Sequence, residues 1–347
     1  MEKIVETIPY DRVKDIDMVR PFFGDQKIIM FDIETTGLSP LKSFTYLIGI
    51  NIFTGNEWQI IQLFNDDGTS EPEMIRTFQE MLKDYDVLMH FNGDTFDIPY
   101  IQKRMQFIEH RFSISLTDNF DTLRSFDLLK YVRPYKFALG LPNLKQKTIE
   151  RYIGLDRVDM FNGGQLIDVY LGYLASGDAH SRELVLRHNR DDMEGMIYLT
   201  SMLGIELMMK GEFGIADLST RPVRGGEGIE LVIKGKLNYP VIHPICNLMD
   251  GMQLDAERDE FILKLPVYYG YMNYYYGSSS KDGCIGAEGY FTRGPIDVME
   301  KLPLYKDKPK SRQGYIMLSD NFLGEKSFVK EFSRRIISEI MHFKRKY

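Results

Sequence analysis

Six short segments between residues 27 and 107 follow one another in an order that few folds share. Their apolar runs and helical spacings predict three strands in succession, then a helix, a fourth strand and a second helix. The segments are residues 27–32, 44–53, 57–64, 71–84, 87–91 and 97–107. A turn at Thr54-Gly55-Asn56 joins the second and third strands, so we expect an antiparallel meander there. This order predicts an α/β fold with a mixed sheet flanked by helices.

The rest of the chain divides into helical and strand-like stretches. Two have helical periodicity and two have strand character: residues 144–153, 181–209, 229–237 and 260–276. The pattern changes after residue 210 and predicts three parts: an N-terminal extension (1–24), the α/β domain (25–210) and a smaller α+β domain (211–347). The last domain ends in a basic amphipathic helix at residues 326–346, whose apolar stripe we expect to pack on the protein.

Two carboxylates stand at the end of the first predicted strand. Asp32 and Glu34 are two positions apart, so both side chains point to the same face, among apolar neighbours. Burying two carboxylates side by side is costly unless cations neutralise them, and Mg²⁺ prefers oxygen ligands. Gly37 follows closely and permits a tight backbone approach beside the pair. The pair alone is a weak signal, so the hypothesis of a metal site needs further ligands.

A third carboxylate, Asp97, begins the helix after the fourth strand. A strand-to-helix junction at the sheet end is well placed for a metal site. The alternative is a structural N-cap, for which Asp94 and Thr95 compete with Asp97.

His188 and Asp192 are four residues apart on a predicted helix and therefore share one face. Asp191 points about 100° away from Asp192, so we favour Asp192 as a ligand. A His–Asp pair of this kind is more often a surface or core pair than part of a functional site. Gathered with the three carboxylates above, however, Asp192 would complete a set that holds two divalent ions for phosphodiester hydrolysis.

Three segments carry a resemblance to a known family. MFDIETTGL, FNGDTFDIPYI and HNRDDMEGM resemble the three motifs of the DEDD superfamily of 3′–5′ exonucleases, within the ribonuclease-H-like fold. The chain most resembles the bacterial group of ribonuclease-H-like predicted exonucleases. Members of that group carry segments similar to FDLLKYVR, LPNLKQKTIERYIGLDR and LIDVYLGYLASGD in this order. The resemblance covers about residues 25–205.

The resemblance implies hydrolysis of single-stranded DNA or RNA from a 3′ end to 5′-mononucleotides. It implies two Mg²⁺ or Mn²⁺ ions about 4 Å apart. Asp32 would bridge both ions, Glu34 and Asp192 would complete one site, and Asp97 would act on the second through water. His188 would lie near the attacking water as general base. Two alternatives on the same fold are a non-catalytic nucleic-acid-binding module and a structure-selective endonuclease.

One residue, His188, departs from the pattern of the better-known subfamilies. In the tyrosine subfamily a Tyr precedes the last Asp by four positions, and His188 stands there in this chain. In the histidine subfamily the His precedes it by five, where this chain has Arg187. The spacing is therefore that of the tyrosine subfamily, whereas the residue is that of the histidine subfamily. Asp127 lies in the segment FDLLKYVR, where a structural hydrogen-bonding role is the alternative to a catalytic one.

Charge and composition bear on partners and location. The net charge of the 347 residues is −7, but residues 301–347 carry a net +7. This basic end suits phosphate contacts, with a solvated helix face as the alternative. Six tyrosines between Tyr268 and Tyr276 would either stack nucleic-acid bases or pack within a sheet.

The cysteines and the absence of long apolar runs predict a cytoplasmic protein with no membrane contact. Cys246 and Cys284 form neither a disulfide framework nor a zinc motif, which fits a reducing compartment. The acidic N-terminus lacks the apolar core of a signal peptide, and no run of about 18 apolar residues occurs.

Overall fold

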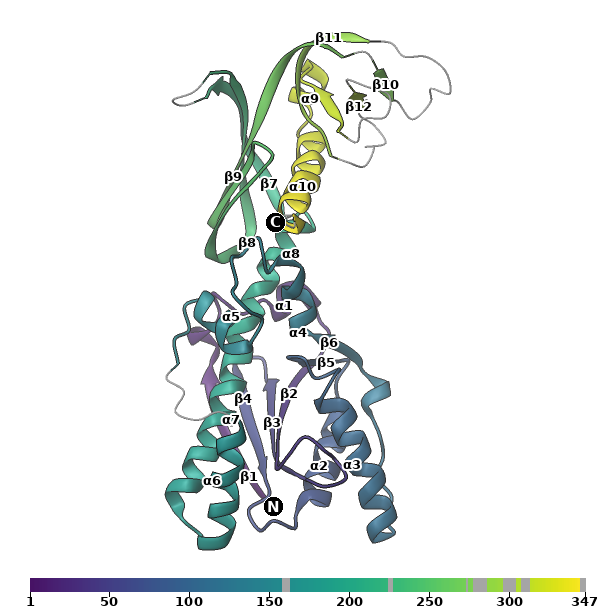
Figure 1. Cartoon of the computed structure of the whole chain (residues 1–347), viewed down its shortest axis with the longest axis vertical. Helices are drawn as coiled ribbons and strands as arrows, with labels where there is room; N and C mark the ends of the chain where they lie inside the picture. Colours follow the sequence, from purple (N-terminus) through teal and green to yellow (C-terminus); the bar gives the residue numbers. More distant parts are fainter. Residues whose placement is uncertain are drawn as a thin grey trace. The chain divides into compact units, whose positions relative to one another are not determined.

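The computed structural model describes residues 1–157, 163–223, 227–272, 274–276, 286–295, 304–306 and 313–343. The chain forms two compact units (Figure 1). The first comprises Met1–Arg133 and Asn143–Ser201, and the second comprises Pro134–Pro142 and Met202–Tyr347. Each unit has its own sheet.

The first unit is built on a six-stranded mixed sheet with the strand order β1-β4-β3-β2-β5-β6. The strands are β1 (Glu2–Pro9), β2 (Ile28–Thr35), β3 (Thr45–Phe53), β4 (Glu57–Phe64), β5 (Val87–His90) and β6 (Arg124–Asp127). β2, β3 and β4 form the expected antiparallel meander, whereas β5 runs parallel to β2 and β6 parallel to β5. The predicted mixed α/β fold is therefore confirmed.

Helices cover both faces of this sheet. The helices of the first unit are α1 (Val19–Phe23), α2 (Glu71–Leu82), α3 (Asp97–Phe112), α4 (Leu128–Val132), α5 (Gln146–Tyr152), α6 (Gly163–Ser176) and α7 (Ala179–Leu199). α2 and α3 lie on one face, and α6 and α7 lie on the other (Figure 1). Ile29, Phe31 and Ile33 of β2 join the core beneath α2 and α3. Because side chains alternate along a strand, the intervening positions of β2 face α7.

Residues 1–24, expected as an extension, contribute to the domain itself. β1 pairs antiparallel with β4 from Glu2 opposite Phe64 to Pro9 opposite Glu57. Most β1 side chains are exposed or half-buried, as is common on an edge strand, and this pattern gives little apolar periodicity in the sequence.

The helix expected over residues 181–209 is interrupted. α7 ends at Leu199, and a 3-10 turn at Thr200–Met202 precedes a second helix, α8 (Leu203–Met209). The Thr200 hydroxyl donates to the Ile197 carbonyl oxygen at 2.7 Å, and its Oγ1 accepts from the Met18 backbone N–H at 3.3 Å. Thr200 hydrogen-bonds back to its own helix, a contact that disfavours a regular continuation.

The second unit contains a seven-stranded antiparallel sheet with the order β10-β12-β13-β11-β9-β8-β7. Its strands are β7 (Phe213–Pro222), β8 (Ile229–Met249), β9 (Met252–Met272), β10 (Tyr274–Tyr276), β11 (Ala287–Arg293), β12 (Leu304–Lys306) and β13 (Tyr315–Met317). Asp250 and Gly251, both with positive φ, turn β8 into β9, as two-residue hairpins require. The unit also contains α9 (Asp320–Gly324) and α10 (Lys326–His342) besides α8.

The predicted C-terminal amphipathic helix is present as α10. This helix contacts β7, β8 and β9. In its predicted apolar stripe Phe328 is half-buried, and the other residues are buried: Val329, Phe332, Ile336, Ile337, Ile340 and Met341. Two of its cations contact an acidic neighbour on the same helix, because Arg334 and Arg335 each lie 2.7 Å from Glu331. Residues 344–346 of the predicted helix lie outside the described residues.

The tyrosine-rich segment is largely exposed where it is described. Tyr269 and Tyr271 are 65% and 60% exposed, so packing within the sheet does not bury them. Tyr269 contacts Tyr290 on β11, with ring centroids 5.0 Å apart. The side chains of Tyr274–Tyr276, and Cys284, lie outside the described residues.

Candidate functional site

β2 directs its two carboxylates toward α7. Asp32 and Glu34 occupy the strand positions that alternate with the core residues beneath α2 and α3. Asn189 of α7 donates to Asp32 Oδ2 at 3.4 Å. The Tyr46 hydroxyl of β3 donates to Glu34 Oε2 at 3.5 Å. The local alternation of β2 therefore places both carboxylates on one face, as the sequence predicts.

α7 supplies the histidine and the last carboxylate. His188 Nε2 lies 3.5 Å from Glu34 Oε1 and 3.2 Å from Asp192 Oδ2. One ligand atom from each of these three residues lies within 4.8 Å of the others. Their side chains are only 13–16% exposed. Residues 154 positions apart in the chain thus form one compact group of possible metal ligands.

A row of polar and small residues holds α7 close to the sheet. Gly49 of β3 pairs with Asp32, and Gln62 of β4 pairs with Gly49. Asn189 lies over this row: its Oδ1 accepts from Gln62 Nε2 at 3.1 Å, while its amide donates to Asp32. Asn51 also donates to the Met193 carbonyl oxygen of α7 at 2.7 Å. The row sets how closely α7 approaches the sheet, and it orients the Asp32 carboxylate.

Asp97 reaches the site from the start of α3. Its Oδ1 accepts from the Ile33 backbone N–H at 3.3 Å, between the two carboxylates of β2. No side chain caps the N-terminus of α3, so neither Asp94 nor Thr95 has that role. Burial of the Asp97 carboxyl raises its pKa to about 6, against the lowering effect of the Ile33 hydrogen bond.

The turn before Asp97 is held by two residues outside the candidate ligand set. Asp127 Oδ1 accepts from the Asn92 N–H at 2.8 Å and caps α4 through the Leu129 N–H at 3.0 Å. His90 Nδ1 accepts from the Gly93 N–H at 2.9 Å. Asp127 therefore makes structural hydrogen bonds, which was one of the two roles considered for it from the sequence. His90 has no sequence signal, because its partners come from the adjacent turn and from β6.

The carboxylates of the site repel one another. Burial, followed by the charges of Asp97, Glu34 and Asp192, raises the pKa of Asp32 well above its ordinary value. Burial and the charge of Asp192 raise the pKa of Glu34 to about 8. Such a group is stabilised by any cation placed among the oxygens. Oxygen donors crowded in this way fit a hard divalent cation such as Mg²⁺ or Mn²⁺.

His188 is suited to a neutral role at this site. Burial lowers the pKa of its imidazole, which outweighs the opposing effect of Asp192. The side chain is therefore uncharged near neutral pH and has a ring nitrogen able to accept a proton or to bind a metal.

Arg157 is part of the site although no sequence pattern indicates it. Its Nη2 donates to Asp192 Oδ1 at 2.8 Å and to Glu150 Oε2 at 2.6 Å. Arg157 is the last residue of the family-like segment LPNLKQKTIERYIGLDR, but that resemblance does not indicate a contact with Asp192. Its separation of 35 residues from Asp192 along the chain conceals the contact.

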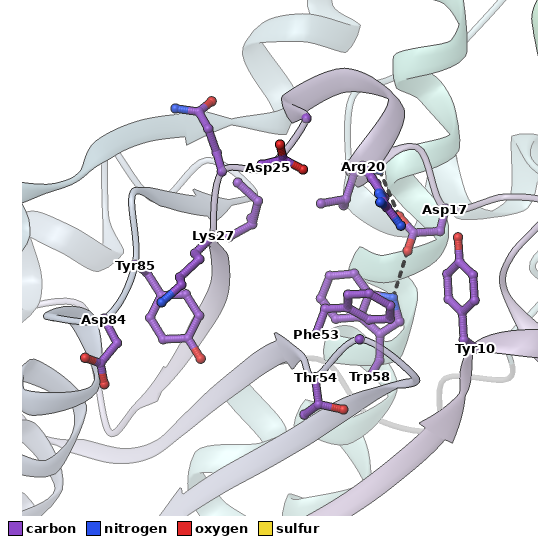
Figure 2. Close-up of a pocket in the computed structure, with 15 residues that line it drawn as sticks. Tyr10, Asp17, Arg20, Asp25, Lys27, Phe53, Thr54, Trp58, Asp84 and Tyr85 are labelled. Atoms are coloured by element: carbon purple, nitrogen blue, oxygen red, sulfur yellow. Dashed lines mark hydrogen bonds between the residues drawn. The ribbon is translucent and has the colours of Figure 1, made fainter.

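A separate cavity of about 520 Å³ lies at the other end of the sheet (Figure 2). Aromatic side chains and both signs of charge line it, including Tyr10, Asp17, Arg20, Lys27, Phe53, Trp58 and Tyr85. Trp58 Nε1 donates to the buried Asp17 carboxylate at 2.9 Å. The cavity begins at Ile28, and Asp32 and Glu34 lie about 13–20 Å further along β2. It is therefore distinct from the carboxylate site.

The sheet order and the helices on its two faces define an α/β protein of the ribonuclease-H-like class. Residues 29–203 match the RNase_H superfamily, and the chain belongs to this family. The matched segment contains all five candidate site residues. Among the described residues, no helix is long and apolar enough to cross a membrane.

The chain is also similar to several archaeal DNA polymerases. It is 34% identical over 108 residues to a DNA polymerase of Thermococcus sp. (strain 9oN-7), covering 27% of this chain and 14% of the relative. It is 34% identical over 106 residues to a DNA polymerase of Desulfurococcus sp. (strain Tok), covering 26% of this chain and 13% of the relative. The chain thus spans about one-seventh of the length of these relatives.

A solved structure is similar over a longer part of the chain. The family B DNA polymerase from the hyperthermophilic archaeon Pyrobaculum calidifontis aligns with a TM-score of 0.42 and 18% identity. The alignment covers 53% of this chain and 25% of that chain.

Proposed function

We propose that the protein is a metal-dependent 3′–5′ exonuclease that hydrolyses single-stranded DNA or RNA to 5′-mononucleotides. The observation that carries the proposal is the convergence of Glu34, His188 and Asp192 within 4.8 Å, beside Asp32 and Asp97. Membership of the RNase_H superfamily and the local similarity to DNA polymerases support a phosphodiester substrate.

The metal ligands in this proposal are Asp32, Glu34, Asp97 and Asp192, which would hold two Mg²⁺ or Mn²⁺ ions. Bound divalent ions supply a nucleophilic water at neutral pH and stabilise the charge on both oxygens of the displacement. The chain's own contribution is to hold these carboxylates close together despite their repulsion. β2 positions one pair, and Asn189 orients Asp32 within it.

His188 has the role of general base in this proposal. Its imidazole is kept neutral by burial, and Nε2 faces the carboxylates. A neutral ring nitrogen beside the attacking water takes up the proton that the water loses. His188 can then release that proton to solvent, because 13% of its side chain is exposed.

The test compares linear and circular single strands of one sequence, as DNA and as RNA, with Mg²⁺, Mn²⁺ or EDTA. We expect a 5′-labelled linear strand to shorten from its 3′ end with either metal, while the circle stays intact. Asp192→Asn should abolish cleavage. Asp191→Asn is the matched control, because Asp191 is the next residue along α7 and is bound by Arg190 at 3.2 Å.

Other outcomes identify the competing functions. Cleavage of the circle would indicate an endonuclease on the same fold. A protein that binds the strands but cleaves neither, with either metal, would contradict the proposal and favour a non-catalytic binding module.

A further inference from the structure

We propose that Arg157, held by Glu150, is a positioning residue that fixes Asp192 and leaves one of its two oxygens for a metal ion. This inference rests on the metal site of the proposed function. It concerns two residues that are not themselves ligands in that proposal and that lie outside the three motif segments.

The geometry divides the two oxygens of Asp192 between two partners. Arg157 Nη2 donates to Oδ1 at 2.8 Å, and His188 Nε2 lies 3.2 Å from Oδ2. Oδ2 is therefore on the side of the carboxylate that faces Glu34 and His188. With Oδ1 occupied by the guanidinium, Oδ2 is the oxygen that would be available to a metal ion.

The guanidinium is itself held by a second carboxylate. Glu150 accepts from Arg157 Nε at 2.8 Å and from Nη2 at 2.6 Å, and Gln146 Nε2 donates to Glu150 Oε1 at 3.0 Å. The same Gln146 amide donates to the backbone carbonyl oxygen of Asp192 at 3.0 Å. Glu150 and Gln146 thus tie α5 to the turn of α7 that carries Asp192.

α7 provides room for this pair by lacking a side chain at one position. A β-carbon on Gly195 would collide with Glu150 Oε1, so Glu150 packs against bare helix backbone. Glu150 is 1% exposed and Arg157 is 12% exposed. This ion pair is therefore enclosed within the domain. It differs from exposed ion pairs, which contribute little to protein stability.

Partners of this kind affect the metal strongly, because a ligand that can rotate loses alignment with the ion. Removing a hydrogen-bonded neighbour of a metal ligand typically weakens metal affinity by about 10–100-fold. Arg157→Gln alone would leave the Glu150 carboxylate buried without its cation, which threatens folding. The double variant Glu150→Gln/Arg157→Gln replaces the ion pair by two amides and avoids that problem.

The experiment measures the Kd for Mn²⁺ by calorimetry, and the Tm in EDTA, for the wild type and the double variant. We expect the double variant to retain a folded Tm and to bind Mn²⁺ about 10–100-fold more weakly. Arg157→Lys, which keeps the charge beside Glu150 and removes the planar fork, is the second variant and should also weaken binding. The matched control is Arg221→Gln/Glu230→Gln, an ion pair of the second unit with a 2.8 Å contact.

Two results would overturn the inference. A folded double variant, or a folded Arg157→Lys, with the wild-type Kd for Mn²⁺ would overturn the positioning role alone. A wild type that binds no Mn²⁺ would overturn the proposed metal site as well, so the two failures are distinguishable.

Discussion

Gly49 of β3 lies so close to Asn189 of α7 that a β-carbon on Gly49 would stand 2.5 Å from Asn189 Oδ1. Because Gly49 has no side chain, Asn189 lies close to the sheet and donates to Asp32, the strand partner of Gly49. The residues of α7 that belong to the candidate site flank Asn189 in the sequence. This close approach of α7 to the sheet therefore requires a residue without a side chain at position 49.

The first prediction concerns this contact. Gly49→Ala should lower the free energy of unfolding by about 1–3 kcal/mol, because the buried Asn189 and Met193 side chains must move. It should also weaken Mn²⁺ binding, since α7 moves away from β2. Urea unfolding and Mn²⁺ calorimetry check both effects. Gly172→Ala on α6, where a β-carbon meets nothing within 4 Å, is the control and should be neutral or slightly stabilising. Unchanged stability and affinity in Gly49→Ala would contradict this account of α7.

A second prediction follows from carboxylate repulsion. Glu34→Gln removes one charge from the cluster and should stabilise the metal-free protein, raising the Tm by about 2–8 °C at pH 8. The same variant should gain less from added Mn²⁺ than the wild type does. Thermal melts in EDTA and in Mn²⁺ measure both. A lower Tm for Glu34→Gln in EDTA would show that the carboxylate has a stabilising structural partner instead.

A third prediction concerns pH. The Glu34 pKa is about 8 in the folded protein and 4.5 as its ordinary value, so the folded state binds more protons between these limits. The free energy of unfolding in EDTA should therefore fall as pH rises through this window, by about 3–4 kcal/mol from pH 5 to pH 8. Urea titrations at several pH values measure it. Glu34→Gln should flatten the profile, whereas an identical profile in that variant would assign the effect to other groups.

A fourth prediction separates two roles for His188. If it is the general base, His188→Asn should lower kcat by about 10²–10⁴-fold and leave the Kd for Mn²⁺ nearly unchanged. The burial that lowers the imidazole pKa implies that activity persists below the ordinary value of 6.5 before it declines. Steady-state kinetics and calorimetry distinguish the cases. Loss of Mn²⁺ binding would make His188 a metal ligand, and a wild-type kcat would exclude the base role.

A fifth prediction tests Asp127 as a structural residue. Asp127→Ala removes the cap of α4 and the acceptor for the Asn92 N–H, and should lower the free energy of unfolding by about 1–2 kcal/mol. The folded variant should keep a kcat within about threefold of the wild type. A large loss of kcat at unchanged stability would instead place Asp127 in the chemistry.

Local sequence patterns predict the helices, the strands and the faces on which their side chains lie. The alternation along β2 places Asp32 and Glu34 on one face, and the four-residue spacing on α7 pairs His188 with Asp192. The meander and the amphipathic α10 follow from the same kind of pattern. The metal and catalytic roles assigned to these residues stay predictions.

Contacts that depend on tertiary packing are not visible in the sequence. β1 is a largely exposed edge strand, so its apolar periodicity is too weak to mark it as part of the sheet. Arg157 meets Asp192 only because α5 packs against α7, and no spacing in the chain encodes that distance. Asn189 lies inside a recognised motif, yet its hydrogen bonds to Gln62 and Asp32 emerge only once α7 lies over the sheet.

We propose that the carboxylates of β2, α3 and α7 form a divalent metal site. Anomalous diffraction from crystals grown with Mn²⁺ tests it directly. We expect manganese peaks within ligand distance of Asp32, Glu34 and Asp192 oxygens, and we expect these peaks to be lost in Asp32→Asn. A well-ordered structure with these side chains as described and no anomalous peak among them would contradict it.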